Sequence, residues 1–184
     1  MRFYTYDGVV DFPCTVPTIK AIAVSLSREC RYAGAGIDWW PVALHSFVVT
    51  DLLPDELKLY GLLHDAAECV TGDIPKPAKT DDMHELETKL LAAIFNRYNV
   101  PVVSNEQDKA VHLADRHTLY GEVWTVGTAS LREIYPYDKK AAQLIRSYQA
   151  QYPVEICVDP NGACVQEFIR RFVLYGGKNG GGRS

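Results

Sequence analysis

Apolar residues recur along most of the chain at intervals of three and four positions, the spacing of helices that bury one face. In residues 18–31, for example, Ile19, Ile22 and Leu26 fall on one side of such a helix. The same spacing predicts helices over 18–31, 41–52, 55–70, 83–98, from 104 past 119, and over 138–148 and 160–175. No segment is rich in strand patterns, and residues 1–14 are expected to be irregular or extended. The pattern therefore predicts an all-α chain.

Polar residues, glycine and proline mark the ends of these helices. Ser104 and Gln107 form a candidate capping box, and Asp159 is a candidate N-cap for the helix predicted at 160–175. The stretch TGDIPKP after residue 70 ends a helix and keeps the residues that follow extended. The closing stretch GGKNGGGRS has the composition of a flexible segment. We expect one domain over 1–176, followed by a glycine-rich flexible tail at 177–184.

Length and composition limit the classes of function. A chain of 184 residues, 47% of them hydrophobic and 23% charged, is long and apolar enough for one globular domain with a full core. No apolar run approaches the roughly 20 residues that span a bilayer, and residues 1–14 lack the layout of a signal peptide. We therefore expect a cytoplasmic protein with no membrane partner.

Charge and cysteine usage exclude further classes. The net charge of −4 argues against a nucleic-acid polymer as partner, although a small anionic ligand needs only a few local cations. The five cysteines are odd in number and form no CxxC pair, so they predict neither a disulfide framework nor a thiolate zinc site. We expect them to be reduced packing residues.

Three of the predicted helices each place a metal-capable side chain among apolar neighbours. They carry His45 in VALHSFVV, the pair His64-Asp65 in LLHDAA, and Asp115 in HLADRH. A buried carboxylate is costly unless it is paired or bound to a metal. Taken singly, each histidine is more often a hydrogen-bonded core residue, and Asp115 is as well explained by an arginine partner. Together they favour a site for a divalent transition metal or, less selectively, magnesium.

A longer stretch resembles a known family. The run HDAAECVTGDIPKPAK at 64–79 is similar over its whole length to the pattern HDA(A/S)E-x-x-x-GD-(I/L)-P-x-P-x-K of the HD-domain metal-dependent phosphohydrolases. The segments LSRECRYAG, VALHS and LADRH resemble further elements of that family, so the resemblance covers roughly 25–122. The chain looks most like the small bacterial 5′-deoxynucleotidases and the phage dATP triphosphohydrolases. The resemblance implies an all-α, HD-domain helical bundle with a metal site between its central helices.

The resemblance also implies a set of metal ligands and acids. The implied ligands are His45, His64, Asp65 and Asp115. Glu68 would position or activate the attacking water; three residues after Asp65, it is expected on the same helix face. Asp73 matches a second acid of the pocket. The implied cofactor is one divalent ion, zinc, cobalt or manganese, with magnesium as a further partner of the phosphates.

Substrate contacts follow from the same motifs. Arg31 and Tyr32 match a pair that touches phosphate and base in the relatives, and Lys79, with Lys76 less securely, would face the phosphates from the turn. One departure is Leu44, where the family commonly has a glutamate. The resemblance therefore implies that a carboxylate partner near the metal site is missing here.

The implied reaction is hydrolysis of a deoxynucleotide at the P–O5′ bond. We favour dATP cleaved to deoxyadenosine and triphosphate, because a second lysine in the turn suits a longer phosphate chain. A 5′-deoxynucleotidase that acts on dNMPs is the alternative, and cleavage of a signalling nucleotide is another. A non-catalytic, metal-stapled helical module that senses a nucleotide or binds a partner would not need Glu68. We also expect a homo-oligomer, for which the apolar residues Val165, Phe168, Ile169 and Phe172 could serve unless they cap the core.

Overall fold

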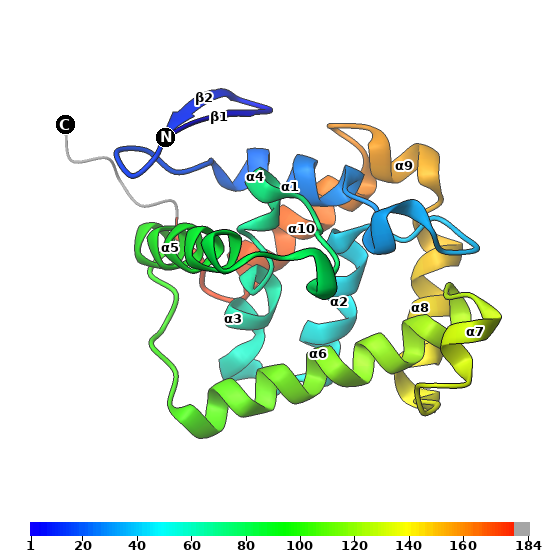
Figure 1. The fold of residues 1–184 in the computed structure, drawn as a ribbon. Coiled ribbons are helices and arrows are strands. Elements are labelled where there is room, and N and C mark those ends of the chain that lie inside the picture. Colours follow the sequence, from blue (N-terminus) through cyan, green and yellow to red (C-terminus); the bar gives the residue numbers. More distant parts are fainter. Residues whose placement is uncertain (179–184) are drawn as a thin grey trace.

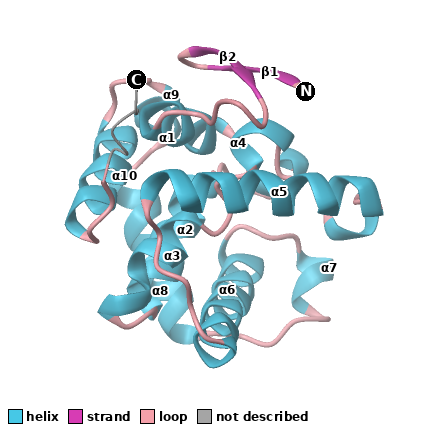
Figure 2. Ribbon diagram, turned by 90° about the vertical axis from the view of Figure 1, so that its left-hand side faces the viewer, coloured by secondary structure: helices cyan, strands magenta, loops and turns pink. Residues whose placement is uncertain are grey.

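The computed structural model describes residues 1–178, and this part of the chain is mostly helical (Figures 1 and 2). The helices are α1 Ile19–Arg28, α2 Val42–Leu52, α3 Lys58–Leu63, α4 Glu68–Thr71, α5 Asp81–Tyr98, α6 Asn105–Thr125, α7 Ala129–Arg132, α8 Lys139–Gln151, α9 Val154–Val158 and α10 Ala163–Leu174. Short 3₁₀ helices span Arg31–Gly34, Asp55–Leu57 and Lys76–Ala78. The tail expected at 177–184 lies, apart from its first two residues, outside the described residues. No helix of the described part is long and apolar enough to cross a membrane.

The N-terminal segment corrects the expectation of an all-α chain. Strands β1 (Arg2–Thr5) and β2 (Gly8–Asp11) form a two-stranded antiparallel sheet that lies over the end of the molecule near α1 and α4 (Figure 1). Gly8 has a φ of +121°, which the tight turn needs and a side chain would resist. Arg2 stands opposite Asp11 in the register, and Arg2 Nε lies 2.7 Å from Asp11 Oδ1. Residues 2–5 and 8–11 are thus extended, as expected, but paired, and residues 12–14 form a turn.

Helix α2 is the centre of the packing. Every residue from 42 to 50 is buried, which fits the nearly continuous apolar run VALHSFVV. A helix that is apolar all round lies inside a protein, and α2 packs against α1, α3, α6, α8 and α10. A polar group on α2 is therefore shielded from water and depends on partners inside the protein. His45 has such partners, whereas Oγ of Ser46 has none in the described part of the chain.

The helix expected at 55–70 is interrupted within the family-like motif. It is divided into the 3₁₀ helix Asp55–Leu57, α3 and α4, with a turn at 64–67. The ring of His64 donates from Nδ1 to the carbonyl of Gly61 at 2.7 Å, and this carbonyl is one that a continuing α-helix would use. The next backbone bonds span three residues, for example from Glu68 N to Asp65 O at 3.0 Å. Residues 55–70 therefore do not form one regular helix, although the bond from Glu68 N to Asp65 O keeps these two residues on one side of the turn.

The predictions at helix ends have mixed outcomes. The capping box of Ser104 and Gln107 is confirmed at the start of α6. Helix α10 begins later than expected, with Gly162 rather than Asp159 as its N-cap. The chain turns tightly there, since a Cβ on Gly162 would lie 2.3 Å from the carbonyl oxygen of Ile156.

The C-terminal apolar residues and the cysteines behave mainly as packing residues. Val165, Phe168 and Phe172 on α10 belong to the core, so they cap it. All five cysteines are free thiols, as expected. The buried ones are Cys69, Cys157 and Cys164.

Candidate metal centre

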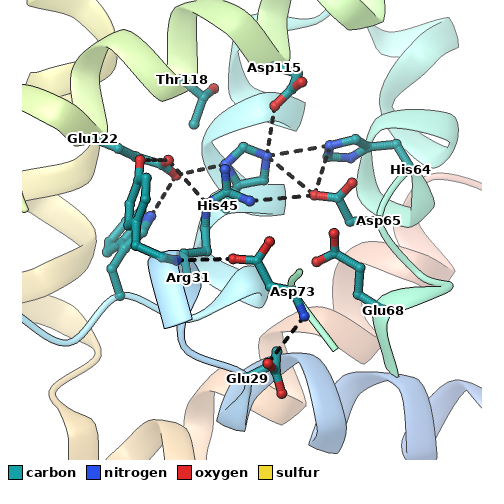
Figure 3. A network of polar contacts seen from close by, with 12 residues as sticks. Glu29, Arg31, His45, His64, Asp65, Glu68, Asp73, Asp115, Thr118 and Glu122 are labelled. Carbon is teal, nitrogen blue, oxygen red and sulfur yellow. Dashed lines mark hydrogen bonds and ion pairs between the residues drawn. The ribbon is translucent and has the colours of Figure 1, made fainter. Parts of the chain in front are cut away.

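The four predicted ligands come together where α2, the turn after α3 and α6 meet (Figure 3). Nε2 of His45 lies 3.4 Å from Nε2 of His64 and 3.2 Å from Oδ1 of Asp115. Oδ2 of Asp65 lies 3.6 Å from the first of these nitrogens and 3.2 Å from the second. Two atoms that each lie about 2.1 Å from one ion at a tetrahedral angle are about 3.4 Å apart. These separations fit ligands that share one ion, and the ligand atoms of His45, His64 and Asp115 all lie within 4.8 Å of one another.

The other ring nitrogen of each histidine, Nδ1, makes a hydrogen bond within the protein. Nδ1 of His45 is 2.7 Å from Oε1 of Glu122, and Nδ1 of His64 is 2.7 Å from the carbonyl oxygen of Gly61. Both partners can only accept a hydrogen bond. The Gly61 oxygen is a carbonyl, and Glu122 is ionised because Arg31 and His45 lower its pKa to about 2 despite its burial. Each ring therefore carries a proton on Nδ1 and, when neutral, presents the lone pair of Nε2 to the cluster. This is the arrangement of metal-binding histidines.

The carboxylates of the cluster favour positive charge on the two histidines. Burial and Arg31 lower the pKa of His45, but Glu122 and Asp115 outweigh them and raise it to about 10. The pKa of His64 is raised as well, because Asp65 outweighs the effect of burial. Without a metal, the two rings would thus hold protons between the carboxylates. A divalent ion would supply the same positive charge and would compete with those protons.

Glu68 stands beside the cluster with one oxygen unused. The residue is 8% exposed, and its Oε2 has no hydrogen-bond partner in the described part of the chain. Burial and then the neighbouring Asp65 and Asp73 raise the pKa of Glu68 to about 9. An unpaired buried carboxylate oxygen is costly, and such groups mark sites where a ligand or a water molecule is bound.

The two lysines of the turn differ. Nζ of Lys79 lies 3.9 Å from Oε1 of Glu68 and donates to Oε2 of Glu87 at 2.8 Å, while the Oγ1 hydroxyl of Thr71 donates to Oε1 of Glu87 at 3.2 Å. Lys76 is exposed and pairs with no residue that the structure describes. The structure thus brings Lys79 to the cluster but not Lys76, and Glu87 is a neighbour that the sequence analysis did not find.

Arg31 and Asp73 lie beside the cluster (Figure 3), and Tyr32 follows Arg31 in the chain. Nη1 of Arg31 lies 3.7 Å from Oδ2 of Asp65, and the backbone N–H of Tyr32 donates to Oδ2 of Asp73 at 3.1 Å. The backbone of Tyr32 and Ala33 adopts the left-handed helical conformation, with φ of 62° and 51°. For a residue with a side chain this conformation costs about 1–2 kcal/mol, so the surrounding contacts must hold it.

Glu122 is the main residue that the sequence analysis missed. It is fully buried on α6, and both of its oxygens accept hydrogen bonds. The carboxylate partner expected to be missing at Leu44 is thus supplied to His45 from another helix. Its signal in the sequence is the spacing of Asp115, Thr118 and Glu122, which places three polar residues on one face of a helix.

Comparisons with known proteins leave the activity open. No protein-family model matches the chain. The chain is 38% identical over 97 residues to the uncharacterized protein YfdR of Escherichia coli, an alignment that covers 52% of this chain and 54% of the relative. It is 34% identical over 97 residues to an uncharacterized protein of Rhodobacter capsulatus, covering 46% and 50%. The chain therefore spans about half the length of these curated relatives.

Proposed function

We propose that the protein is a metal-dependent phosphohydrolase of the HD-domain type that hydrolyses a deoxynucleotide at its P–O5′ bond. The leading substrate is dATP, which would give deoxyadenosine and triphosphate. One observation carries the proposal: two imidazole nitrogens and two carboxylates converge on one point, with both Nδ1 atoms already donating elsewhere. Such a set of acceptors suits a transition-metal ion.

The ion held by His45, His64, Asp65 and Asp115 would be zinc, cobalt or manganese, with magnesium accompanying the phosphates. When bound, it would polarise a phosphoryl oxygen and lower the pKa of a water molecule. The residues suit this ion by their donor atoms, by the 3.2–3.6 Å from His45 to each of the other three, and by the 3.2 Å from His64 to Asp65.

The chain's own groups would carry the rest of the reaction. Glu68, when ionised, takes a proton from water on its free Oε2 as the oxygen of that water attacks phosphorus. The bond from phosphorus to O5′ breaks, and the proton that Glu68 took is released to O5′ of the leaving nucleoside, which restores the carboxylate. Lys79 and Arg31 offset the negative charge that builds on the phosphate.

A 5′-deoxynucleotidase acting on dNMPs is the second candidate, and the placement of Lys76 favours it. The preference for a triphosphate rests partly on two lysines facing the phosphates. Lys76 is exposed, whereas Lys79 lies beside Glu68. One phosphate needs fewer cations than three.

Product identity distinguishes the candidates. The protein, loaded separately with manganese, cobalt and zinc, is incubated with dATP and with dAMP, and the products are resolved by ion-exchange chromatography. We expect deoxyadenosine and intact triphosphate from dATP. Phosphate from dAMP, with dATP untouched, would replace the first candidate by the second. If neither substrate reacts with any of these metals, both are wrong, and the non-catalytic nucleotide-sensing module becomes the better explanation.

A further inference from the structure

The carboxylate of Glu122 joins two parts of the site. Its Oε1 accepts from Nδ1 of the candidate ligand His45 and from Nε1 of Trp40, each at 2.7 Å. Its Oε2 accepts from Nε of Arg31 at 3.1 Å and from the hydroxyl of Tyr32 at 2.8 Å. Because the carboxylate is planar and fully buried, the direction of one pair of bonds fixes that of the other.

The 3₁₀ turn Arg31–Gly34 depends on this carboxylate. Its residues Tyr32 and Ala33 hold a left-handed conformation that is unfavourable by itself. Besides backbone bonds from Arg31 N to Trp40 O and from Ala35 N to Tyr32 O, its contacts come from Glu122 and from Asp73, which accepts from the backbone N–H of Tyr32. Arg31 also reaches Asp65, so the contacts form a closed ring through Glu122, Arg31, Asp65 and His45.

We infer that Glu122 is a positioning residue that couples cation binding at His45 to the order of the Tyr32 turn. A cation on Nε2 of His45 strengthens the bond from Nδ1 to Glu122 and thereby fixes the acceptor of Tyr32 and Arg31. The ordered turn in the same way holds His45 ready for the cation, because such coupling is reciprocal. The inference rests on the proposed metal site and adds that the turn carrying Arg31 and Tyr32 becomes fully ordered when that site is filled.

Nuclear magnetic resonance of the full chain, labelled with ¹⁵N, tests the coupling without measuring activity. The indole N–H signal that disappears in Trp40→Phe reports on Oε1 of Glu122, and the backbone amide of Tyr32 reports on the turn. We expect both signals to shift together when zinc is added to the metal-free protein. Zinc affinity is measured in parallel by competition with a chromophoric chelator.

Glu122→Gln should break the link. Its amide NH₂ must face one of the two pairs of donors, so one side loses its acceptor. We expect zinc affinity to fall by about 10- to 100-fold, the usual cost of removing the partner of a ligand histidine. At saturating zinc the Tyr32 amide should no longer shift.

Two further variants keep the test decisive if Glu122→Gln folds poorly. Tyr32→Phe removes one donor to Oε2 and should reduce zinc affinity less than Glu122→Gln, while its own amide stops responding to zinc. Tyr60→Phe is the matched control, because it also removes a tyrosine–carboxylate bond, the one of 2.9 Å to Asp108. It should keep both the amide response and, within about twofold, the zinc affinity, since this bond joins no residue of the ring through Glu122, Arg31, Asp65 and His45.

The outcomes separate the two proposals. If the wild-type protein does not bind zinc, the metal site and the coupling are both wrong. If zinc binds but the Tyr32 amide stays unmoved, or if the variants of Glu122 and Tyr32 keep the full response, the coupling alone is wrong. A purely structural Glu122 would lower the unfolding temperature in Glu122→Gln and leave zinc affinity unchanged.

Discussion

Two buried polar networks meet the central helix α2, and they differ in where their positive charge comes from. The first is built around Arg171 of α10, whose guanidinium is held on several sides by protein acceptors. These are Phe47 O at 3.2 Å, Thr50 Oγ1 at 2.8 Å, Asp51 Oδ1 at 2.9 Å, Glu167 Oε1 at 2.8 Å, and the hydroxyl of Tyr148. This network contains its own cation, so it is complete without a ligand.

In the second network, around His45, histidine nitrogens and carboxylate oxygens that can accept hydrogen bonds face one another. The two Nε2 atoms lie 3.4 Å apart, carboxylates of Asp65 and Asp115 stand beside them, and Oε2 of Glu68 has no partner among the residues described. Its one guanidinium, that of Arg31, lies at the edge between Asp65 and Glu122. Two networks of similar burial thus differ in composition: the first contains its own cation, and the second is the one in which we propose that a cation is bound beside Glu68.

Glu68→Gln should give the largest effect, and only in the second network. If Glu68 is the general base, hydrolysis by the metal-loaded protein should slow by about 10²- to 10⁴-fold. The free energy of unfolding and zinc affinity should change little, because the unpartnered oxygen contributes no bond to the fold. Glu167→Gln, a change of the same kind beside Arg171, should leave the rate per folded molecule intact. An unaltered rate in Glu68→Gln would remove its proposed role.

Arg171→Met should give the largest effect on stability. Removing the cation leaves Asp51 with only the hydroxyl of Tyr148 as partner, while Glu167 keeps Arg170. Breaking a buried pair by removing one member costs about 3–5 kcal/mol in the free energy of unfolding. We expect about 3 kcal/mol, near the lower end of that range, since the side chain of Asp51 is 26% exposed. Urea denaturation measures this, and zinc affinity of the folded variant should equal that of the wild type. A loss below about 1 kcal/mol, the value of an exposed ion pair, would show that the network contributes little.

Metal addition tests the second network alone. Its effect on the free energy of unfolding should be slightly smaller than that of Arg171→Met. Zinc at about 100 times its dissociation constant should add about 2.7 kcal/mol to the free energy of unfolding, and a chelator should reverse the gain. The same increment is expected in Arg171→Met, and a smaller one in Asp115→Asn, which removes a ligand charge. If zinc raises the unfolding temperature equally in Asp115→Asn, the ion binds elsewhere.

The sequence predicts the parts of this molecule that depend on local chemistry. The capping box of Ser104 and Gln107 lies within four consecutive residues, and α2 is predicted by one apolar run. The convergence of His45, His64 and Asp115 was also predictable, because each stands in an apolar stretch where a charged group must have a reason to be buried.

The features that the sequence did not predict depend on contacts between distant segments. The interruption after α3 depends on a bond from the ring of His64 to a carbonyl, which competes with the helix ladder. The pairing of β1 with β2 overrides a segment with no clear alternation. Glu122 lies 77 residues from His45, and only the packing of α6 on α2 brings them together. For the same reason, the exposed position of Lys76 could not be separated from that of Lys79 by sequence alone.

Glu87→Gln should give the smallest effect, a change in KM for the nucleotide, and it tests the role of Lys79 beside the cluster. Glu87 holds Nζ of Lys79 at 2.8 Å and must release it if the lysine is to reach a phosphate. Without that charge, KM for the nucleotide should fall about two- to fivefold with kcat little changed, because ion pairs of this kind contribute up to about 1 kcal/mol. Glu85→Gln, which removes the partner of the exposed Lys89 on the same helix, is the control and should leave KM unchanged. A rise in KM in Glu87→Gln would instead mean that Glu87 holds Lys79 in its working position.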